Sequence, residues 1–173
     1  MLALDVIALL TTSLLAMTKL NKNYRMGPCW PMFLMTFSLI LGGTFGVMFG
    51  LARENVAILV IGSVLGTFTL IAFMCTGCRN PGIVARRQFR LDADEIYDER
   101  AMTFRPVDAI FDHETGTIIR EMDHFCPWTG TIIARGNMLA FQLFTSSLCV
   151  LILFIVAVVI WGLADIARKN GNS

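Results

Sequence analysis

Charged side chains are scarce in this chain of 173 residues: they make up 16% of it, whereas hydrophobic residues make up 55%. Ordinary soluble domains have about 25% charged and roughly 45–50% apolar residues. The charge deficit is concentrated in three long runs that contain no Asp, Glu, Lys, Arg or His. A chain this short could hardly bury three such runs on every face, so the pattern argues against a soluble protein and indicates a membrane protein.

A charge excess, a basic tail and an internal repeat are also missing, and the formal net charge is only +1. Nothing in the chain therefore indicates a nucleic-acid partner, and none is expected. The cysteines are odd in number and unevenly spaced, unlike the disulfide framework of a small secreted protein. They are Cys29, Cys75, Cys78, Cys126 and Cys149.

The three uncharged runs are residues 32–52, 56–75 and 138–164. Each can cross a bilayer, because about 20 apolar residues span the hydrocarbon core as a helix. Only residues 53–55 join the first two runs, which predicts a tight antiparallel pair of helices. A shorter run at 6–18 could be an added span, an interfacial helix or a signal-anchor. The expected fold class is an all-α polytopic membrane protein with three firm transmembrane helices and a possible short fourth at the N-terminus.

Lys and Arg residues precede the first firm span and follow the second, which predicts that both flanking segments are cytosolic. The long segment after the second span is then a cytosolic, mostly irregular loop with reduced thiols. The C-terminal tail falls on the opposite side although it carries Arg168 and Lys169, a mild conflict with the same rule. The expected domains are an N-terminal apolar segment with a basic linker (1–31), a transmembrane hairpin (32–75), the loop (76–137), a transmembrane helix (138–164) and a polar tail (165–173).

Glycines recur at four-residue spacing on both helices of the predicted hairpin. Small residues at this spacing let helix backbones approach closely, although glycine is also common in membrane helices generally. We expect these glycines to lie at helix–helix contacts. They are Gly42, Gly46 and Gly50 on the first helix, and Gly62 and Gly66 on the second.

Asn137 and the Cys75–Cys78 pair lie at the ends of predicted spans, and each suggests a local role. Asn137 directly precedes the third span and is a candidate N-cap, whose side-chain oxygen would accept a hydrogen bond from a free N–H of the first turn. Cys75 and Cys78 form a C-x-x-C at the end of the second span. We expect these thiols at the membrane boundary, where they could be auto-acylated; zinc binding is the alternative.

The loop contains the sequence MDHFCPW, residues 122–128. A cysteine thiolate is the nucleophilic form, and a free thiol is only a few per cent thiolate at neutral pH. An imidazole can take the thiol proton, and a carboxylate can hold that imidazole in the useful tautomer. Cys126, His124 and Asp123 would supply these three roles. A thiol in a loop just before a membrane helix suits a substrate that has a polar reactive end and a lipid tail.

This stretch resembles the Met-Asp-His-His-Cys-Pro-Trp motif of the DHHC-type protein S-acyltransferases, or palmitoyltransferases, except at Phe125. Downstream, Asn137 and Phe141 fall at the distances found in that family. The NPG at residues 80–82 is similar to the family's Asp-Pro-Gly motif. The resemblance extends over roughly residues 25–164 and includes the arrangement of spans.

The resemblance implies a function and a set of partners. The motif cysteine of the family accepts a fatty acyl group from acyl-CoA and passes it to a cysteine of a substrate protein. Carried over, Cys126 is the acyl-accepting nucleophile, His124 the base and Asp123 its orienting group. Palmitoyl-CoA would be the co-substrate, and the partners would be membrane lipid and cysteine-bearing membrane-associated proteins. The location would be an endomembrane such as Golgi or ER, and the first three turns of the third span would help line an acyl cavity.

A cluster of three arginines lies in the loop after the second span: Arg86, Arg87 and Arg90. They would attract anionic lipid and set the topology. Contact with the phosphates of CoA is the alternative, and on that basis they are candidate substrate-binding residues.

The resemblance also implies two structural zinc ions, yet no Cys or His remains at the eight ligand positions, and no metal ligand is assigned. The first set of positions is Asp98, Ala101, Phe111 and Ile118, and the second set is Asp112, Thr115, Phe125 and Ile132. We hypothesise that Phe111 packs on Ile118 and Phe125 on Ile132. Each buried side chain would recover about 1.5–3 kcal/mol, against on the order of 10 kcal/mol for a zinc, so we expect a looser loop than in zinc-bearing relatives.

The fourth span and the Thr-Thr-x-Glu motif of the family do not occur before Ser173. Two alternatives to acyl transfer therefore stay open. One is a catalytically impaired or truncated membrane scaffold, or remnant, that keeps the motif. The other is a membrane thiol hydrolase that uses the same three residues to deacylate proteins.

Overall fold

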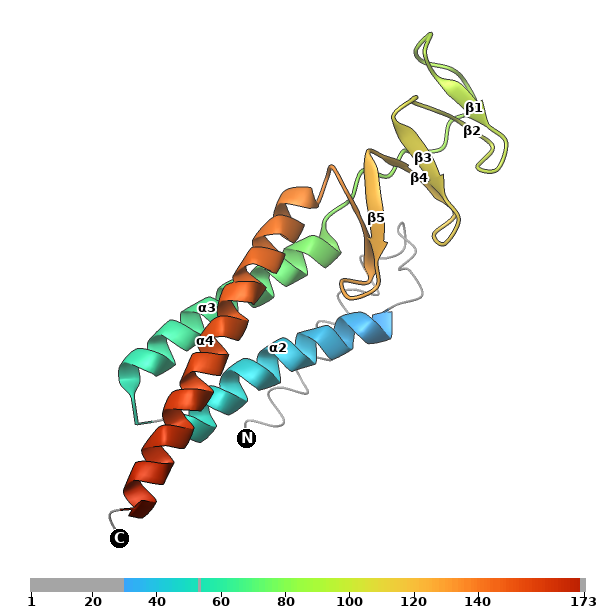
Figure 1. The fold of residues 1–173 in the computed structure, drawn as a ribbon. Helices are drawn as coiled ribbons and strands as arrows, with labels where there is room; N and C mark the ends of the chain where they lie inside the picture. Colours follow the sequence, from blue (N-terminus) through green and yellow to red (C-terminus); the bar gives the residue numbers. More distant parts are fainter. Residues whose placement is uncertain (1–29, 53, 172–173) are drawn as a thin grey trace, which may run out of the picture.

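Three long helices and three β-hairpins make up the computed structural model, which describes residues 30–171 except residue 53 (Figure 1). The helices are α2 (Trp30–Leu51), α3 (Val56–Cys78) and α4 (Met138–Gly171). They pack side by side, and the hairpins extend in a row from one end of the bundle (Figure 1). The predicted short span at 6–18 lies outside the described residues.

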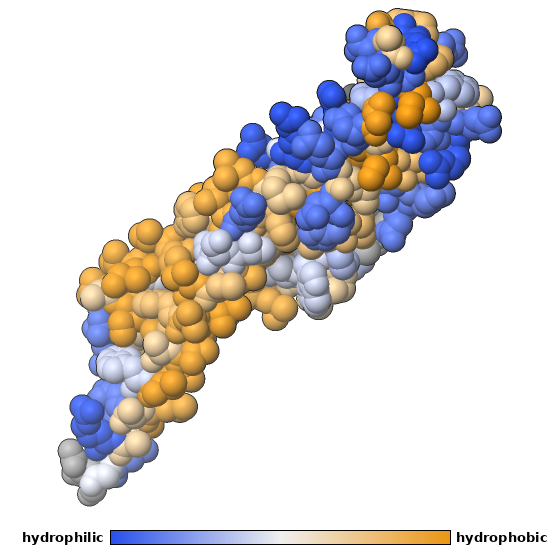
Figure 2. Space-filling view, turned by 45° about the horizontal axis from the view of Figure 1, so that its top comes forward, coloured by the Kyte–Doolittle hydropathy of each residue, from blue (hydrophilic) through white to orange (hydrophobic). Residues whose placement is uncertain are grey.

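All three helices are long and apolar enough to cross a membrane, which confirms the predicted multi-pass membrane protein. Figure 2 shows hydrophobic residues covering the helices, with hydrophilic residues gathered over the hairpins and at the C-terminal end of α4. Large apolar side chains such as Phe49, Val64 and Leu153 are exposed on the bundle, where a soluble protein would avoid a continuous apolar patch. The 34 residues of α4 measure about 51 Å along its axis, so α4 must tilt in a bilayer or protrude from it.

Close packing of α2 on α3 depends on the glycines of α3 alone. A Cβ added to Gly66 would lie 2.5 Å from Cγ2 of Thr44, and one added to Gly62 would lie 2.4 Å from Sδ of Met48. The prediction is therefore confirmed for α3. It is not confirmed for α2, because within the described part of the chain a Cβ on its stripe at 42, 46 and 50 would meet nothing within 4 Å. The α2 face that meets α3 carries Thr44 and Met48 instead.

An aromatic cluster fixes the helix ends that lie next to the hairpins. Phe33 near the start of α2 stacks on Phe73 near the end of α3, with ring centroids 4.6 Å apart. Phe144 near the start of α4 packs on the same Phe73 ring at 5.0 Å. All three side chains are buried, so one contact from each helix holds the bundle together directly beneath the hairpins.

The predicted loop contains six short strands, so the all-α, mostly irregular description is not confirmed. The strands pair as three separate antiparallel hairpins. Each strand is only three to five residues long, which is too short for an alternating pattern to stand out in the sequence. The hairpins are β1–β2 (Ile96–Asp98, Thr103–Arg105), β3–β4 (Ala109–Asp112, Thr117–Arg120) and β5–β6 (Met122–Cys126, Thr131–Ala134).

The two predicted apolar pairs are confirmed. Phe111 lies directly opposite Ile118 in the β3–β4 hairpin, and Phe125 lies opposite Ile132 in the β5–β6 hairpin. The isoleucines are only 2% and 3% exposed, and each belongs to a small apolar cluster that includes its phenylalanine. Because an isolated two-stranded hairpin is marginally stable in water, these clusters supply the missing core.

Candidate active site

Strand β5 explains why a phenylalanine separates the histidine from the cysteine. Successive side chains of a strand point to opposite faces. Phe125 packs against Ile132 and the buried Ile119 of the neighbouring hairpin. His124 and Cys126 therefore share the other face, which is turned toward the helices, since the His124 ring makes an edge-on contact with Phe141 of α4 at 5.4 Å between centroids. Phe125 anchors the strand while its neighbours carry the chemistry.

Asp123 and His124 are already paired. Nδ1 of His124 lies 3.0 Å from Oδ2 of Asp123. When the carboxylate accepts the Nδ1 hydrogen, the imidazole keeps its lone pair on Nε2, which can then accept a proton. The His124 side chain is 43% exposed and the Asp123 side chain is 58% exposed, so a substrate can reach this pair from the solvent side.

Cys126 ends strand β5 and is only 6% exposed. A tight turn follows it: Gly130 donates to the carbonyl of Pro127 at 3.1 Å and has a φ of +64°, which suits a residue without Cβ. The Thr129 hydroxyl donates to the Cys126 carbonyl at 3.3 Å. Within the described part of the chain, no hydrogen bond joins the Cys126 thiol to His124. Their Cα atoms are about 6–7 Å apart along the strand.

The candidate arginines lie elsewhere. Arg87 forms an ion pair with Glu95 at 2.7 Å, and its backbone N–H donates to Thr103 of the first hairpin. The Leu91 N–H and this ion pair hold the pKa of Glu95 below its usual value. Arg90 donates to the carbonyls of Asp92 and Ala93. The structure thus places Asp123, His124 and Cys126 in the third hairpin, whereas Arg87 and Arg90 bond near the first hairpin. Contact of Arg86, Arg87 and Arg90 with CoA stays a prediction.

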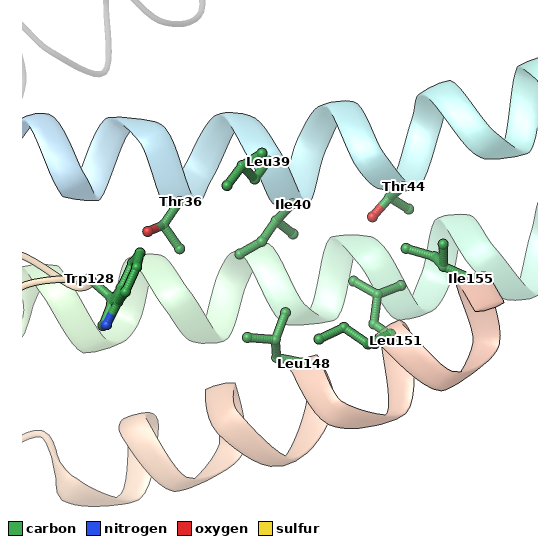
Figure 3. Close-up of a pocket in the computed structure, with 9 residues that line it drawn as sticks. Thr36, Leu39, Ile40, Thr44, Trp128, Leu148, Leu151 and Ile155 are labelled. Atoms are coloured by element: carbon green, nitrogen blue, oxygen red, sulfur yellow. The ribbon is translucent and has the colours of Figure 1, made fainter.

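An apolar cavity of about 240 Å³ lies between α2 and α4, close to the turn that follows Cys126 (Figure 3). Trp128 stands at one end of it, and the side chains of both helices point into it (Figure 3). The first three turns of α4 were expected to help line an acyl cavity; of these turns, Leu148 alone lines the cavity described here. The lining residues are Thr36, Leu39, Ile40, Thr44, Trp128, Leu148, Leu151, Ile152 and Ile155. The contributions of α2 and Trp128 were not predicted, because they depend on how distant segments pack.

The residues at the eight implied zinc positions do not fit a metal. Apolar side chains fill five of them, and the two carboxylates that remain are already bound by protein groups. Asp98 pairs with Arg100 at 3.1 Å and Arg105 at 3.0 Å, and Asp112 accepts from the Thr115 N–H and hydroxyl at 2.8 and 2.6 Å. Among residues 30–52 and 54–171, no three His, Cys, Asp or Glu side chains gather closely enough to hold an ion.

The hairpins and α4 coincide with the part of the chain that known proteins resemble. A sequence model described as DHHC palmitoyltransferase matches residues 95–173. The resemblance to the DHHC palmitoyltransferase family is confirmed. The matched segment, here the DHHC-like domain, begins just before β1 and includes Asp123, His124 and Cys126.

Two curated relatives carry the same name. The palmitoyltransferase pfa5 of Aspergillus fumigatus is 26% identical over 85 residues, which cover 47% of this chain and 18% of the relative. The palmitoyltransferase pfa5 of Emericella nidulans is 27% identical over 70 residues, which cover 39% of this chain and 14% of the relative. The matched segments thus span less than a fifth of the length of either relative.

Proposed function

We propose that this DHHC-like chain is a protein S-palmitoyltransferase that moves a long-chain acyl group from acyl-CoA to a protein cysteine through a thioester on Cys126. The observation that carries the proposal is the arrangement on β5. An Asp123–His124 pair shares a strand with Cys126, and the face that carries His124 and Cys126 is turned toward α4. The family resemblance supports the same chemistry, since the relatives are named palmitoyltransferases.

In the first half-reaction, Nε2 of His124 takes the proton of the Cys126 thiol, directly or through one water. The thiolate attacks the carbonyl carbon of acyl-CoA, and a new S–C bond forms as the bond to the CoA sulfur breaks. The CoA thiolate leaves with the proton that His124 returns. Asp123 holds the ring in the required tautomer and stabilises the imidazolium while it exists.

In the second half-reaction, a cysteine of the substrate protein attacks the Cys126 thioester. His124 removes the proton of the incoming thiol, the bond between Cys126 and the acyl carbon breaks, and the proton returns to the Cys126 sulfur. The acyl chain would lie in the cavity between α2 and α4, where each CH₂ removed from water gains about 0.8 kcal/mol. Trp128, two residues beyond the nucleophile, would guide the chain from the turn into that cavity.

The same proposal places the hairpins on the cytosolic side, because basic residues flank the spans there. By analogy with the family, the membrane would be an endomembrane such as Golgi or ER. The partners would be membrane lipid, acyl-CoA and membrane-associated proteins with an accessible cysteine.

One observation favours a catalytically impaired scaffold as the second candidate. Cys126 is buried, and in the described part of the chain no hydrogen bond joins it to His124. A strand that cannot shift would hold the base too far from the thiol. The thiol hydrolase uses the same three residues and differs only in the group that attacks the thioester.

The deciding experiment is hydroxylamine-sensitive labelling of the membrane-embedded chain with an alkyne analogue of palmitoyl-CoA. The background carries Cys75→Ser and Cys78→Ser, because exposed thiols at the end of α3 could acylate on their own. Cys126→Ser should abolish the label, whereas the matched control Cys149→Ser, on the exposed surface of α4, should keep it.

Equal labelling of the two variants contradicts the proposal. An unlabelled parent protein supports the scaffold. Label that leaves Cys126 only as free fatty acid, without reaching any protein thiol, supports the hydrolase.

A further inference from the structure

Asn137 is the point at which the third hairpin, α3 and α4 meet. It directly precedes α4, and its side chain is fully buried. The structure corrects the predicted N-cap role, because the side-chain oxygen accepts from the backbone N–H of Ala134 at 2.9 Å rather than from a helix N–H. The side-chain amide donates to the carbonyls of Ile132 at 2.9 Å and Thr76 at 3.2 Å. Every hydrogen-bonding group of this side chain is therefore used.

Without Asn137, each of these three backbone groups would lack a hydrogen-bond partner. The Ile132 carbonyl and the Ala134 N–H belong to β6, which pairs with β5 and with no other strand of the described residues. The outer edge of such a strand leaves its N–H and C=O groups unpaired. The Thr76 carbonyl is in the last turn of α3, where helix carbonyls have no intrahelical donor. One buried amide thus completes a strand edge and a helix end, and the Thr76 carbonyl that it reaches is 61 residues away in sequence.

Gly136, the residue before Asn137, packs tightly in the same junction. Gly136 donates to the Pro81 carbonyl at 3.0 Å, and a Cβ at this position would lie 2.2 Å from the carbonyl oxygen of Asn80. The Asn80 side chain in turn accepts from the N–H groups of Gly82 and Ile83 at 2.9 Å each. The NPG turn and the Gly136–Asn137 turn therefore fit directly against each other, with no space for a side chain between them.

We infer that Asn137 is a positioning residue of the candidate site. By holding β6 against the end of α3 and the start of α4, it fixes where β5 presents His124 and Cys126 over the helices. The expected effect on acyl transfer rests on the proposed function, whereas the role of Asn137 in holding the hairpin does not. A misplacement of about 1 Å can cost on the order of 100-fold in rate, so a shift of this hairpin should be visible in acyl transfer before the fold is lost.

The test uses the full chain in lipid nanodiscs with Cys126 as the only cysteine, the other four being replaced by serine. Asn137→Asp keeps the shape but loses both donors, and Asn137→Ser keeps a single hydroxyl. Thr145→Val is the matched control, because its hydroxyl bonds only to carbonyls within α4. Two rates are measured: alkylation of Cys126 by a water-soluble maleimide, and acylation of Cys126 by palmitoyl-CoA.

We expect the two rates to move in opposite directions. Asn137→Asp should raise the alkylation rate roughly threefold or more, because the buried thiol becomes accessible. It should lower the maximal acylation rate about tenfold or more, with little change in the KM for palmitoyl-CoA. Asn137→Ser should fall between Asn137→Asp and the control.

Alkylation and acylation rates of both variants within roughly twofold of the control would overturn the inference, while acylation of Cys126 itself would leave the proposed function standing. If Cys126 is never acylated in the parent protein, the proposed function fails, and the alkylation rates alone decide the role of Asn137. If Asn137→Asp does not fold, Asn137→Ser decides by the same two rates.

Discussion

The two sets of implied metal positions fill their space in different ways. Each contains an apolar pair across a hairpin and one buried carboxylate. In the first set the carboxylate of Asp98 is held by two arginines, and the guanidinium of Arg100 also covers the Phe111 ring at 5.1 Å. In the second set the carboxylate of Asp112 is held by a neutral turn. A buried carboxylate beside an apolar pair can therefore be stabilised either by ion pairs, as at Asp98, or by hydrogen bonds from a neutral turn, as at Asp112.

Of the two sets, the second lies next to the candidate catalytic residues. Phe125 belongs to β5 and lies between His124 and Cys126, so packing at this set positions the candidate site directly. The first set connects β1–β2 to β3–β4, farther along the row of hairpins (Figure 1). If this division holds, substitutions at the second set should affect acylation, whereas matched substitutions at the first set should affect stability alone.

The largest effect is expected from the two histidines. His124 adjoins the second set and His113 contacts Phe111 of the first set. His124→Ala should slow acylation of Cys126 by about 10²–10⁴-fold, because the general base is lost. His113→Ala should leave the rate unchanged. Single-turnover labelling with palmitoyl-CoA measures both, and equal rates for the two variants would remove the catalytic role of β5.

The next effect compares Ile118→Ala with Ile132→Ala, two buried isoleucines opposite phenylalanines. Each should cost about 2–5 kcal/mol of stability, because each leaves a cavity. Only Ile132→Ala should also slow acylation at a temperature where both variants remain folded. Thermal melts and labelling rates on the same samples test this, and a rate loss in Ile118→Ala as large as in Ile132→Ala would contradict the division.

A smaller effect is expected from pH. The Arg100 and Arg105 side chains lower the pKa of Asp98 to about 2, below the roughly 3.9 of an unfolded aspartate. The depressed pKa stabilises the fold above the unfolded value, and this contribution is lost as the pH falls through about 2. Melting temperatures between pH 5 and pH 2 should therefore fall less steeply for Asp98→Asn than for the parent chain. Parallel curves would show that the ion pairs do not stabilise the first set.

The smallest effect is expected from metal removal. Since neither set has a Cys or His and the carboxylate in each is already bound by protein groups, dialysis against EDTA should change neither the melting temperature nor the acylation rate. Elemental analysis of the purified chain provides the independent measurement. A drop in melting temperature that added zinc restores would contradict the assignment of both sets as metal-free.

The helices were predictable, whereas the strands were not. Runs without charge identify a span whatever lies around them, because the bilayer imposes the length. Strands such as Ile96–Asp98 are too short for periodicity and form because neighbouring apolar clusters support them. The pairing of Phe111 with Ile118 was still predicted, because the family resemblance places both residues at one site.

The same limit applies to the candidate site. Asp123, His124 and Cys126 were identified from their chemistry and proximity in sequence. The cavity side formed by Thr36 and Ile40, and the bonds from Asn137 to α3, depend on contacts between segments that are distant in the sequence. Neither can be derived without knowing where each helix ends.

The order of the hairpins has a consequence for the choice of acceptor. The strand that carries Cys126 belongs to the hairpin fastened to the helix ends, while the other two lead outward from it (Figure 1). Under the proposed function, Cys126 is held close to the bilayer surface and cannot reach a thiol far from the membrane. A recipient thiol must arrive at that depth, so the chain would serve cysteines close to a membrane anchor and pass over those on the far side of a soluble domain.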